Sequence, residues 1–299
     1  MTPKNSDLVF AILSPFFSSI STVFQAQAAK LLNPIIIASI GAILGSLILF
    51  LVLLLQKKGV NFQRIIKNYK EFLIMIVIRP ILGQLLLVFG LSLTTGIKAI
   101  FFTKAEPFFV LFWHWVFKKE KIKTSYFILL AFHIAGAVIL STGKSFMLNK
   151  PQFGDLLIIL AIGLFSLSYF YGKTLATNVG SQLSNAITLG IAGIILFPFI
   201  FLVKPFPYPT VHPTGWFYLL VSVLLFNVIG LTFWFSSLKT VPAWIVSALR
   251  AIGPLVGAPV AYFLFGETLS PLQVLGGILV ILTSFLIARE HLNSRYHSN

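Results

Sequence analysis

The sequence contains no cysteine, which rules out disulfide bonds, zinc sites with Cys ligands and catalysis by a thiol. Acidic residues are also scarce, with 7 Asp and Glu against 22 Lys and Arg in 299 residues. Only 10% of the residues are charged, whereas 58% are hydrophobic. A soluble globular domain carries about 25% charged residues. The chain is therefore too apolar for a single soluble core, and a lipid bilayer is its natural solvent.

Long apolar segments recur along nearly the whole chain and are separated by short polar links. A membrane-spanning helix needs about 20 apolar residues. We predict ten spanning helices, at residues 7–29, 34–56, 71–92, 96–117, 124–142, 153–174, 180–203, 214–238, 242–265 and 270–288. The first segment has no signal-peptide cleavage pattern, so we expect it to be retained.

Basic residues are distributed unevenly between the two faces of the predicted bundle. Fourteen of the 22 Lys and Arg fall on the face that holds both termini, and five fall on the opposite face. Cytoplasmic loops of membrane proteins carry an excess of Lys and Arg. We therefore expect a multi-pass protein of a bacterial plasma (inner) membrane, with both termini in the cytoplasm.

The two halves of the chain resemble each other at an offset of 147 residues. The matched pairs include Gly83 and Gly230, Pro107 and Pro254, and Glu120 and Glu267. Each half holds five predicted spans, an odd number, so the second half must enter the membrane in the opposite direction. Inverted repeats are typical of transporters with alternating access. We predict an all-α integral membrane fold of two inverted five-helix repeats around a central cavity, over 1–147 and 148–290, with a polar cytoplasmic tail over 291–299.

The residues around the matched prolines carry a resemblance to a known family. The predicted fourth span contains the run A-E-P-F-F at Ala105–Phe109, and the predicted ninth span repeats the pattern over Gly253–Thr268. On these motifs, and on Arg79 in the third span, the sequence resembles the EamA family of the drug/metabolite transporter superfamily. The resemblance covers essentially the whole chain and implies a ten-helix carrier. The sequence departs from the pattern at Gly253, where the family has a second glutamate.

Four ionisable residues lie deep within predicted spans: Arg79, Lys104, Glu106 and Arg250. Such residues cost about 2.5–3.5 kcal/mol each to insert and are functional candidates. Three bases against one acid leave the interior positive, which favours a substrate with a carboxylate, a phosphate or another anionic group. We predict that Arg250 and Lys104 anchor the substrate. The structural alternative is an ion pair between Arg79 and Glu106, with Lys104 snorkelling along its helix.

Pro107 and Pro254 remove backbone donors, which frees the carbonyl groups of Thr103 and Arg250. We predict that these positions act as hinges whose free carbonyls face a ligand or water, and a kink that only shapes packing is the alternative. Other polar and aromatic residues are expected to complete the cavity wall, namely Gln25, Ser166, Tyr169, Asn227 and Trp234.

These features predict a secondary transporter that moves a small amino-acid-like or anionic metabolite by alternating access. A multidrug or lipid-precursor exporter of the same fold is the alternative, and a channel or scaffold comes after it. An intramembrane enzyme is disfavoured because there is no HExxH or GxSxG motif, and because Glu106 is the one carboxylate deep in a predicted span. We expect membrane lipid as a partner, and no cofactor, metal or nucleic acid. Proton coupling through Glu106 and facilitated diffusion fit the sequence equally, as do a monomer and a homodimer.

Overall fold

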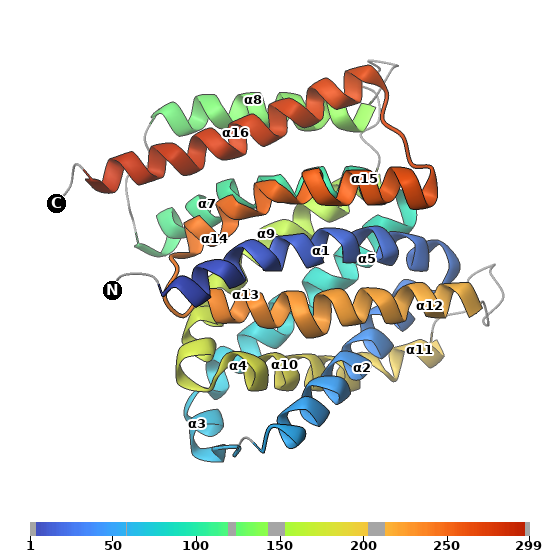
Figure 1. The fold of residues 1–299 in the computed structure, drawn as a ribbon, viewed down its shortest axis with the longest axis vertical. Coiled ribbons are helices and arrows are strands. Elements are labelled where there is room, and N and C mark those ends of the chain that lie inside the picture. Colours follow the sequence, from blue (N-terminus) through green and yellow to red (C-terminus); the bar gives the residue numbers. More distant parts are fainter. Residues whose placement is uncertain (1–3, 58, 119–123, 143–152, 203–212, 297–299) are drawn as a thin grey trace.

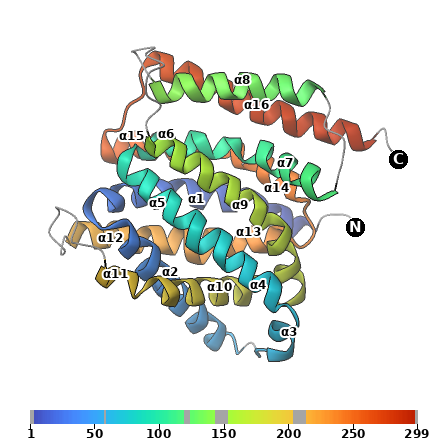
Figure 2. The same cartoon turned by 180° about the vertical axis from the view of Figure 1, so that it is seen from behind.

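The computed structural model describes residues 4–57, 59–118, 124–142, 153–202 and 213–296. Within these ranges the regular structure is entirely helical and includes no strand. The helices lie side by side in stacked layers, as Figure 1 shows. The helix α1 begins and the helix α16 ends on the same side of the molecule (Figures 1 and 2).

Each half of the chain contains long helices and interrupted ones. The first half consists of α1 (Asn5–Leu31), α2 (Pro34–Leu55), α3 (Phe62–Lys67), α4 (Tyr69–Ile76), the π-helical segment η1 (Val77–Gly83), α5 (Gln84–Leu93), α6 (Gly96–Phe102), the 3₁₀ segment η2 (Thr103–Ala105), α7 (Glu106–Lys118) and α8 (Thr124–Thr142). The second half consists of α9 (Phe153–Asn178), α10 (Ser181–Leu196), α11 (Phe199–Leu202), α12 (Pro213–Ser222), the π-helical segment η4 (Val223–Gly230), α13 (Leu231–Ser237), α14 (Ala243–Leu249), the 3₁₀ segment η5 (Arg250–Ile252), α15 (Gly253–Phe265) and α16 (Pro271–Tyr296).

Six helical stretches among the described residues are long and apolar enough to cross a membrane. They are Asn5–Leu31, Pro34–Leu55, Tyr69–Leu93, Phe153–Asn178, Ser181–Phe201 and Pro213–Ser237, and they match six of the ten predicted spans. Shorter apolar helices at Phe127–Leu140, Gly253–Phe265 and Pro271–Leu286 fall within three of the others. The outer surface is rich in exposed apolar side chains such as Phe263, which is 79% exposed. A surface of this kind suits a lipid environment.

Two predicted spans are not continuous helices, which corrects the sequence-based boundaries. The spans over 96–117 and 242–265 are each interrupted by one turn of 3₁₀ helix, η2 and η5. Proline has no N–H to bond the carbonyl four residues earlier, and the chain tightens just before it. The N–H of Glu106 bonds the carbonyl of Thr103, and the N–H of Gly253 bonds that of Arg250.

The last helix is longer than the hydropathy pattern predicts. We expected the tenth span to end at residue 288 and a polar tail to follow over 291–299. The helix α16 continues to Tyr296, so most of that segment is helical. Residues 297–299 lie outside the described part of the chain, as does Glu120 with its neighbours.

The element boundaries follow the offset of 147 residues. The segments α6 and α14 begin at residues 96 and 243, η2 and η5 at residues 103 and 250, and α7 and α15 at residues 106 and 253. The π-helical segments η1 and η4 end at Gly83 and Gly230. Two pairs of equivalent helices pack against each other, α2 with α10 and α8 with α16.

Candidate functional site

An ion pair joins the two broken helices at their breaks. Glu106 is the first residue of α7, and Arg250 is the first residue of η5. Arg250 Nε lies 2.7 Å from Glu106 Oε2. Glu106 is 0% exposed, and neither of its carboxylate oxygens accepts an aligned hydrogen bond from a described residue. The buried carboxylate is therefore balanced mainly by the charge of Arg250.

The structure does not contain the ion pair between Arg79 and Glu106 that the sequence offered as the structural alternative. The Glu106 carboxylate pairs with Arg250, which comes from the other half of the chain. Arg79 Nη1 instead donates a hydrogen bond to Ser168 Oγ at 2.7 Å. The guanidinium carbon of Arg79 lies 4.1 Å from the centroid of the Trp234 ring and 4.9 Å from that of Phe165. Arg79 is thus a buried cation held by aromatic faces and a hydroxyl, with no carboxylate bound to it among the described residues.

Lys104 does not snorkel towards the surface, because it is fully enclosed at the break in the first half. Its Nζ donates a hydrogen bond to the backbone carbonyl of Arg250. That carbonyl is one of the two that the prolines free, so a lysine of this chain occupies the acceptor that we expected to face a ligand. The carbonyl of Lys104 accepts a hydrogen bond from Ser284 Oγ at 2.7 Å, which ties the same turn to α16.

The departure from the family pattern at Gly253 has a steric explanation. A Cβ atom at this position would lie 2.7 Å from Lys104 Nζ and closer still to Ser19 Oγ. Both separations are below van der Waals contact, so a larger residue would displace the ammonium group. Glycine at residue 253 leaves the space that Lys104 needs to reach the Arg250 carbonyl.

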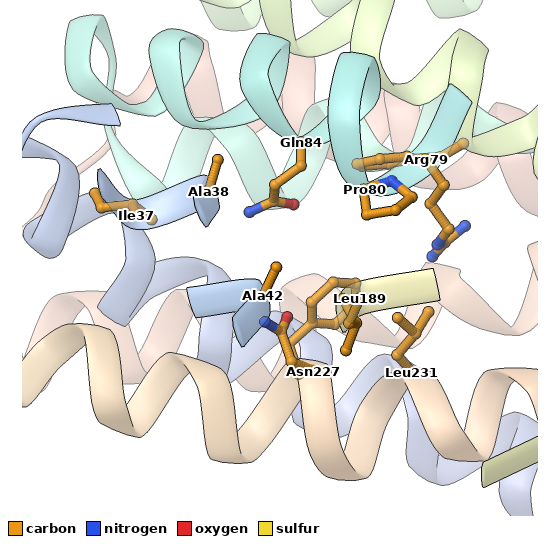
Figure 3. Close-up of a pocket in the computed structure, with 11 residues that line it drawn as sticks. Ile37, Ala38, Ala42, Arg79, Pro80, Gln84, Leu189, Asn227 and Leu231 are labelled. Atoms are coloured by element: carbon orange, nitrogen blue, oxygen red, sulfur yellow. The ribbon is translucent and has the colours of Figure 1, made fainter. Parts of the chain in front are cut away.

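A cavity of about 20 Å³ lies beside Arg79, which is enough for roughly one water molecule. Pro80 and Gln84 line one wall together with Arg79, and Asn227 and Leu231 line the other (Figure 3). Figure 3 shows Gln84 and Asn227 facing each other across the space. The four predicted ionisable residues are at most 8% exposed, so this conformation encloses them.

Most of the other predicted cavity residues lie near these charges. The Tyr169 and Trp234 rings pack edge to face with centroids 5.0 Å apart, and the Tyr169 hydroxyl lies beside Arg250 without forming an aligned hydrogen bond to a described residue. Ser166 Oγ donates to the carbonyl of Ile162 at 2.8 Å and to that of Glu106 at 3.3 Å. Ser166 is therefore engaged by backbone.

Asn227 and Gln25 differ in what they contact. Asn227 Nδ2 donates to the carbonyl of Gly41 at 2.9 Å, and the carbonyl of Asn227 accepts from Asn185 Nδ2 at 2.7 Å. Gln25 is buried in α1. Asn227 lines the cavity beside Arg79, whereas Gln25 is not among the described residues that line it.

Sequence reasoning missed two polar residues near the site, Asn185 and Ser168. Ser168 orients Arg79, and Asn185 holds the π-helical segment η4 through the Asn227 carbonyl. Each was visible as a polar residue inside an apolar run. Nothing in the linear pattern separates them from the many other polar residues inside apolar runs.

Comparison with known proteins places the chain among membrane transporters. A model of the EamA-like transporter family matches residues 5–142 and again residues 152–289. The pseudopaline exporter CntI of Pseudomonas aeruginosa is 22% identical over 294 residues, which cover 95% of this chain and 96% of that protein. An uncharacterized transporter of Methanothermobacter thermautotrophicus is 22% identical over 92% of this chain and 84% of that protein.

A crystal structure of a protein with 13% sequence identity has the same fold. It matches with a TM-score of 0.70, covering 96% of this chain and 99% of that chain. The two matches to the family model together cover nearly the whole sequence, and the curated relatives are named as transporters. The protein is a transporter and not an enzyme, and the chain belongs to the EamA-like transporter family.

Proposed function

We propose that the protein is a secondary transporter for a small organic metabolite that carries an anionic group. The observation that carries the proposal is Arg79, a buried guanidinium that is not bound to a carboxylate among the described residues and that lines a cavity. Arginine stays protonated in proteins. A buried cation needs a partner, and a carboxylate or phosphate of the substrate is the complementary group.

Arg79 replaces Arg250 as the first anchor in this proposal. In the enclosed conformation Arg250 is neutralised by Glu106, and Lys104 is bonded to the Arg250 carbonyl. These three residues link the two breaks and form one side of the proposed site. Trp234 and Tyr169 continue from Arg79 to Arg250 and supply an apolar wall for the body of the substrate.

We further propose that the transporter is built from two inverted five-helix repeats that move by alternating access. Two polar contacts that match to within one residue at the offset of 147 support this arrangement. Thr240 Oγ1 lies 2.7 Å from Asp7 Oδ2 near the start of α1, and Thr94 Oγ1 lies 2.6 Å from Asp155 Oδ1 near the start of α9. The helices α1 and α9 begin on opposite sides of the molecule (Figure 2). Pro107 and Pro254 would act as the hinges at the breaks.

Transport out of the cytoplasm is the direction that we propose. The relative CntI is named as an exporter, and it matches this chain over nearly all of its length. Pseudopaline is the substrate named for CntI. For this chain, the similarity supports only export as the direction of transport and a metabolite as the class of substrate. Uptake into inside-out vesicles, and none into right-side-out vesicles, is the result expected of an exporter.

Counterflow in proteoliposomes tests the function. A panel of anionic, zwitterionic and cationic metabolites would be compared in the wild type and in the variants Arg79→Lys, Arg79→Gln and Arg250→Gln. We expect exchange of a carboxylate- or phosphate-bearing compound, lost in Arg79→Gln and reduced at least about tenfold in Arg79→Lys, because lysine cannot reproduce the planar stacking of arginine. Arg64→Gln changes an exposed base on α3 and serves as the matched control.

Transport confined to cations, or anion transport unchanged in Arg79→Gln, would remove the proposed site. Membership of the transporter family would stand in either case, because it rests on the match to the whole chain.

A further inference from the structure

A larger cavity, of about 330 Å³, lies apart from the charged residues. It is found where α2, α9 and α13 end and α10 begins. Its lining includes Leu53, Val60, Ser181, Thr232, Ser236 and Lys239. Its volume is at the lower end of the range of about 300–1,000 Å³ that is usual for small-molecule sites. The described residues that line it include a base and several hydroxyl groups and no acidic residue.

The first turn of α10 forms one wall of this cavity. Gly180 precedes the helix with φ of 111°, a backbone conformation that favours glycine, and no side chain caps the helix. The first intrahelical bond runs from the N–H of Ser184 to the carbonyl of Gly180. The N–H groups of the first turn have no acceptor within the helix, and this end carries the positive pole of the helix dipole. Such an end attracts an anion.

Ser181 gives independent evidence for a ligand at this position. Its side chain is nearly enclosed, with the residue 5% exposed, and it lines the cavity. Its hydroxyl has no hydrogen-bond partner among the residues that the structure describes. Buried polar groups in native proteins nearly always have a partner. A hydroxyl placed in this way is expected of a residue that binds a ligand.

A line of polar contacts leads from this cavity to the cavity beside Arg79. Thr232 lines the larger cavity and Asn227 lines the smaller one. Asn185 bridges them, because its Nδ2 donates to Thr232 Oγ1 at 2.9 Å and to the carbonyl of Asn227 at 2.7 Å. The Oδ1 atom of Asn185 is buried and has no hydrogen-bond partner in the described part of the chain. Asn185 therefore connects a residue of one cavity to a residue of the other.

We propose that the larger cavity is a second anion-binding site, which takes a carboxylate or phosphate group between the first turn of α10, the Ser181 hydroxyl and the Lys239 ammonium group. The anion is either a soluble metabolite or the headgroup of an anionic lipid, since both present the same chemistry at the end of a helix bundle. If the anion is soluble, it binds here first and then moves to Arg79. That role rests on the proposed transport function. The binding itself does not depend on it.

Binding of inorganic phosphate to the purified full-length protein tests the site. Titration in a neutral detergent would be followed by ³¹P line broadening, with Lys239→Gln and Ser181→Ala as the test variants and Lys239→Arg as the conservative one. We expect saturable binding in the wild type that is weakened about five- to tenfold in each test variant and is restored in Lys239→Arg. Lys70→Gln, which changes an exposed base on α4, is the control.

The variant Arg79→Gln separates this inference from the proposed function. It is expected to lose transport and to keep phosphate binding at the larger cavity. Equal phosphate binding in the wild type, Lys239→Gln and Ser181→Ala would overturn the second site and leave the Arg79 proposal unaffected.

The source of the anion is resolved in nanodiscs. Discs of phosphatidylcholine alone would be compared with discs that contain phosphatidylglycerol. If a lipid headgroup fills the site, phosphatidylglycerol abolishes phosphate binding to the wild type. If a soluble anion fills it, phosphate binding is the same in both discs. Phosphate binding that is absent from both kinds of disc would refute the site.

Discussion

The ammonium group of Lys104 donates a hydrogen bond to the backbone carbonyl of Arg250, so a side chain at one helix break reaches the backbone of the other. The offset of 147 residues pairs Lys104 with Ala251, which has no ammonium group. The contact is therefore made in one direction only. The two halves share their backbone breaks, while the side chains that join the breaks differ.

The space for Lys104 depends on Gly253. We expect Gly253→Ala to lower the free energy of unfolding by about 1–3 kcal/mol, because its Cβ would press on Lys104 Nζ and Ser19 Oγ. Thermal unfolding of the purified protein measures the change. Gly59→Ala is the control, because a Cβ at residue 59 meets nothing within 4 Å. An unchanged melting temperature in Gly253→Ala would contradict the steric explanation for glycine at this position.

The ion pair of Arg250 and Glu106 predicts a particular double-variant result. Removing one partner leaves an uncompensated buried charge, so Glu106→Gln should cost about 3–5 kcal/mol of stability. The double variant Glu106→Gln with Arg250→Gln should recover much of this loss, because both charges are then absent. Denaturant unfolding of the wild type, both single variants and the double variant measures the coupling. Additive losses would contradict a direct interaction.

The same variant tests whether Glu106 carries protons. If transport is proton-coupled through this carboxylate, the variant Glu106→Gln should no longer respond to a pH gradient across the vesicle membrane. We expect this loss, because Glu106 is the carboxylate that the described residues place between the two helix breaks. Transport in Glu106→Gln that the gradient still stimulates would exclude Glu106 as the proton carrier.

Trp234 is predicted to set the affinity of the proposed site. Its ring lies 4.1 Å from the guanidinium carbon of Arg79. Trp234→Phe keeps an apolar ring and weakens the cation–π contact by about 1 kcal/mol, so KM should rise about fivefold with little change in maximal rate. Kinetics of counterflow separate the two parameters. Trp115→Phe, at a position that is 49% exposed, should leave both unchanged.

Glu267 is predicted to hold one end of the bundle closed. Its carboxylate accepts hydrogen bonds from Gln27 Nε2 at 2.9 Å and from the N–H of Ile97 at 2.9 Å, and it pairs with Lys30 at 3.3 Å. Glu267→Ala removes contacts that join α1 to the start of α6. We expect a cysteine placed at Ala26, which is fully buried beside Gly96, to react with a soluble maleimide at least about tenfold faster in that background.

The chain has no cysteine of its own, so Ala26→Cys alone provides the baseline for that labelling. Glu71→Ala, which changes a carboxylate on α4, is the matched control. Equal labelling in the presence and absence of Glu267→Ala would mean that other contacts keep this end closed.

Hydropathy predicts the long helices well because the thickness of the bilayer sets their length. The stretch Pro34–Leu55 agrees with the predicted span over 34–56 to one residue. Prolines also indicated where the interrupted helices would bend. They did not indicate that the predicted spans would divide into separate helices with a 3₁₀ turn between them, because that depends on which donors reach the freed carbonyls.

The pairing of the charges could not be predicted from the sequence. Arg79 and Arg250 both lie deep within predicted spans, so either one could have met Glu106. The choice depends on how the two halves cross, and a one-dimensional pattern does not contain that information. The need for glycine at residue 253 could not be predicted either. It depends on contact with Lys104, which lies 149 positions earlier in the chain and belongs to the other half.

The π-helical segments η1 and η4 have a consequence for the motion of the site. A π turn holds one residue more than an α turn, and successive residues of an α-helix are rotated by about 100° around its axis. If that extra residue passes along the helix, the side chains it crosses swing around the axis while the helix stays intact. Arg79 lies within η1. Rotation about the helix axis would turn the Arg79 guanidinium towards or away from bound substrate without any bending of the helix.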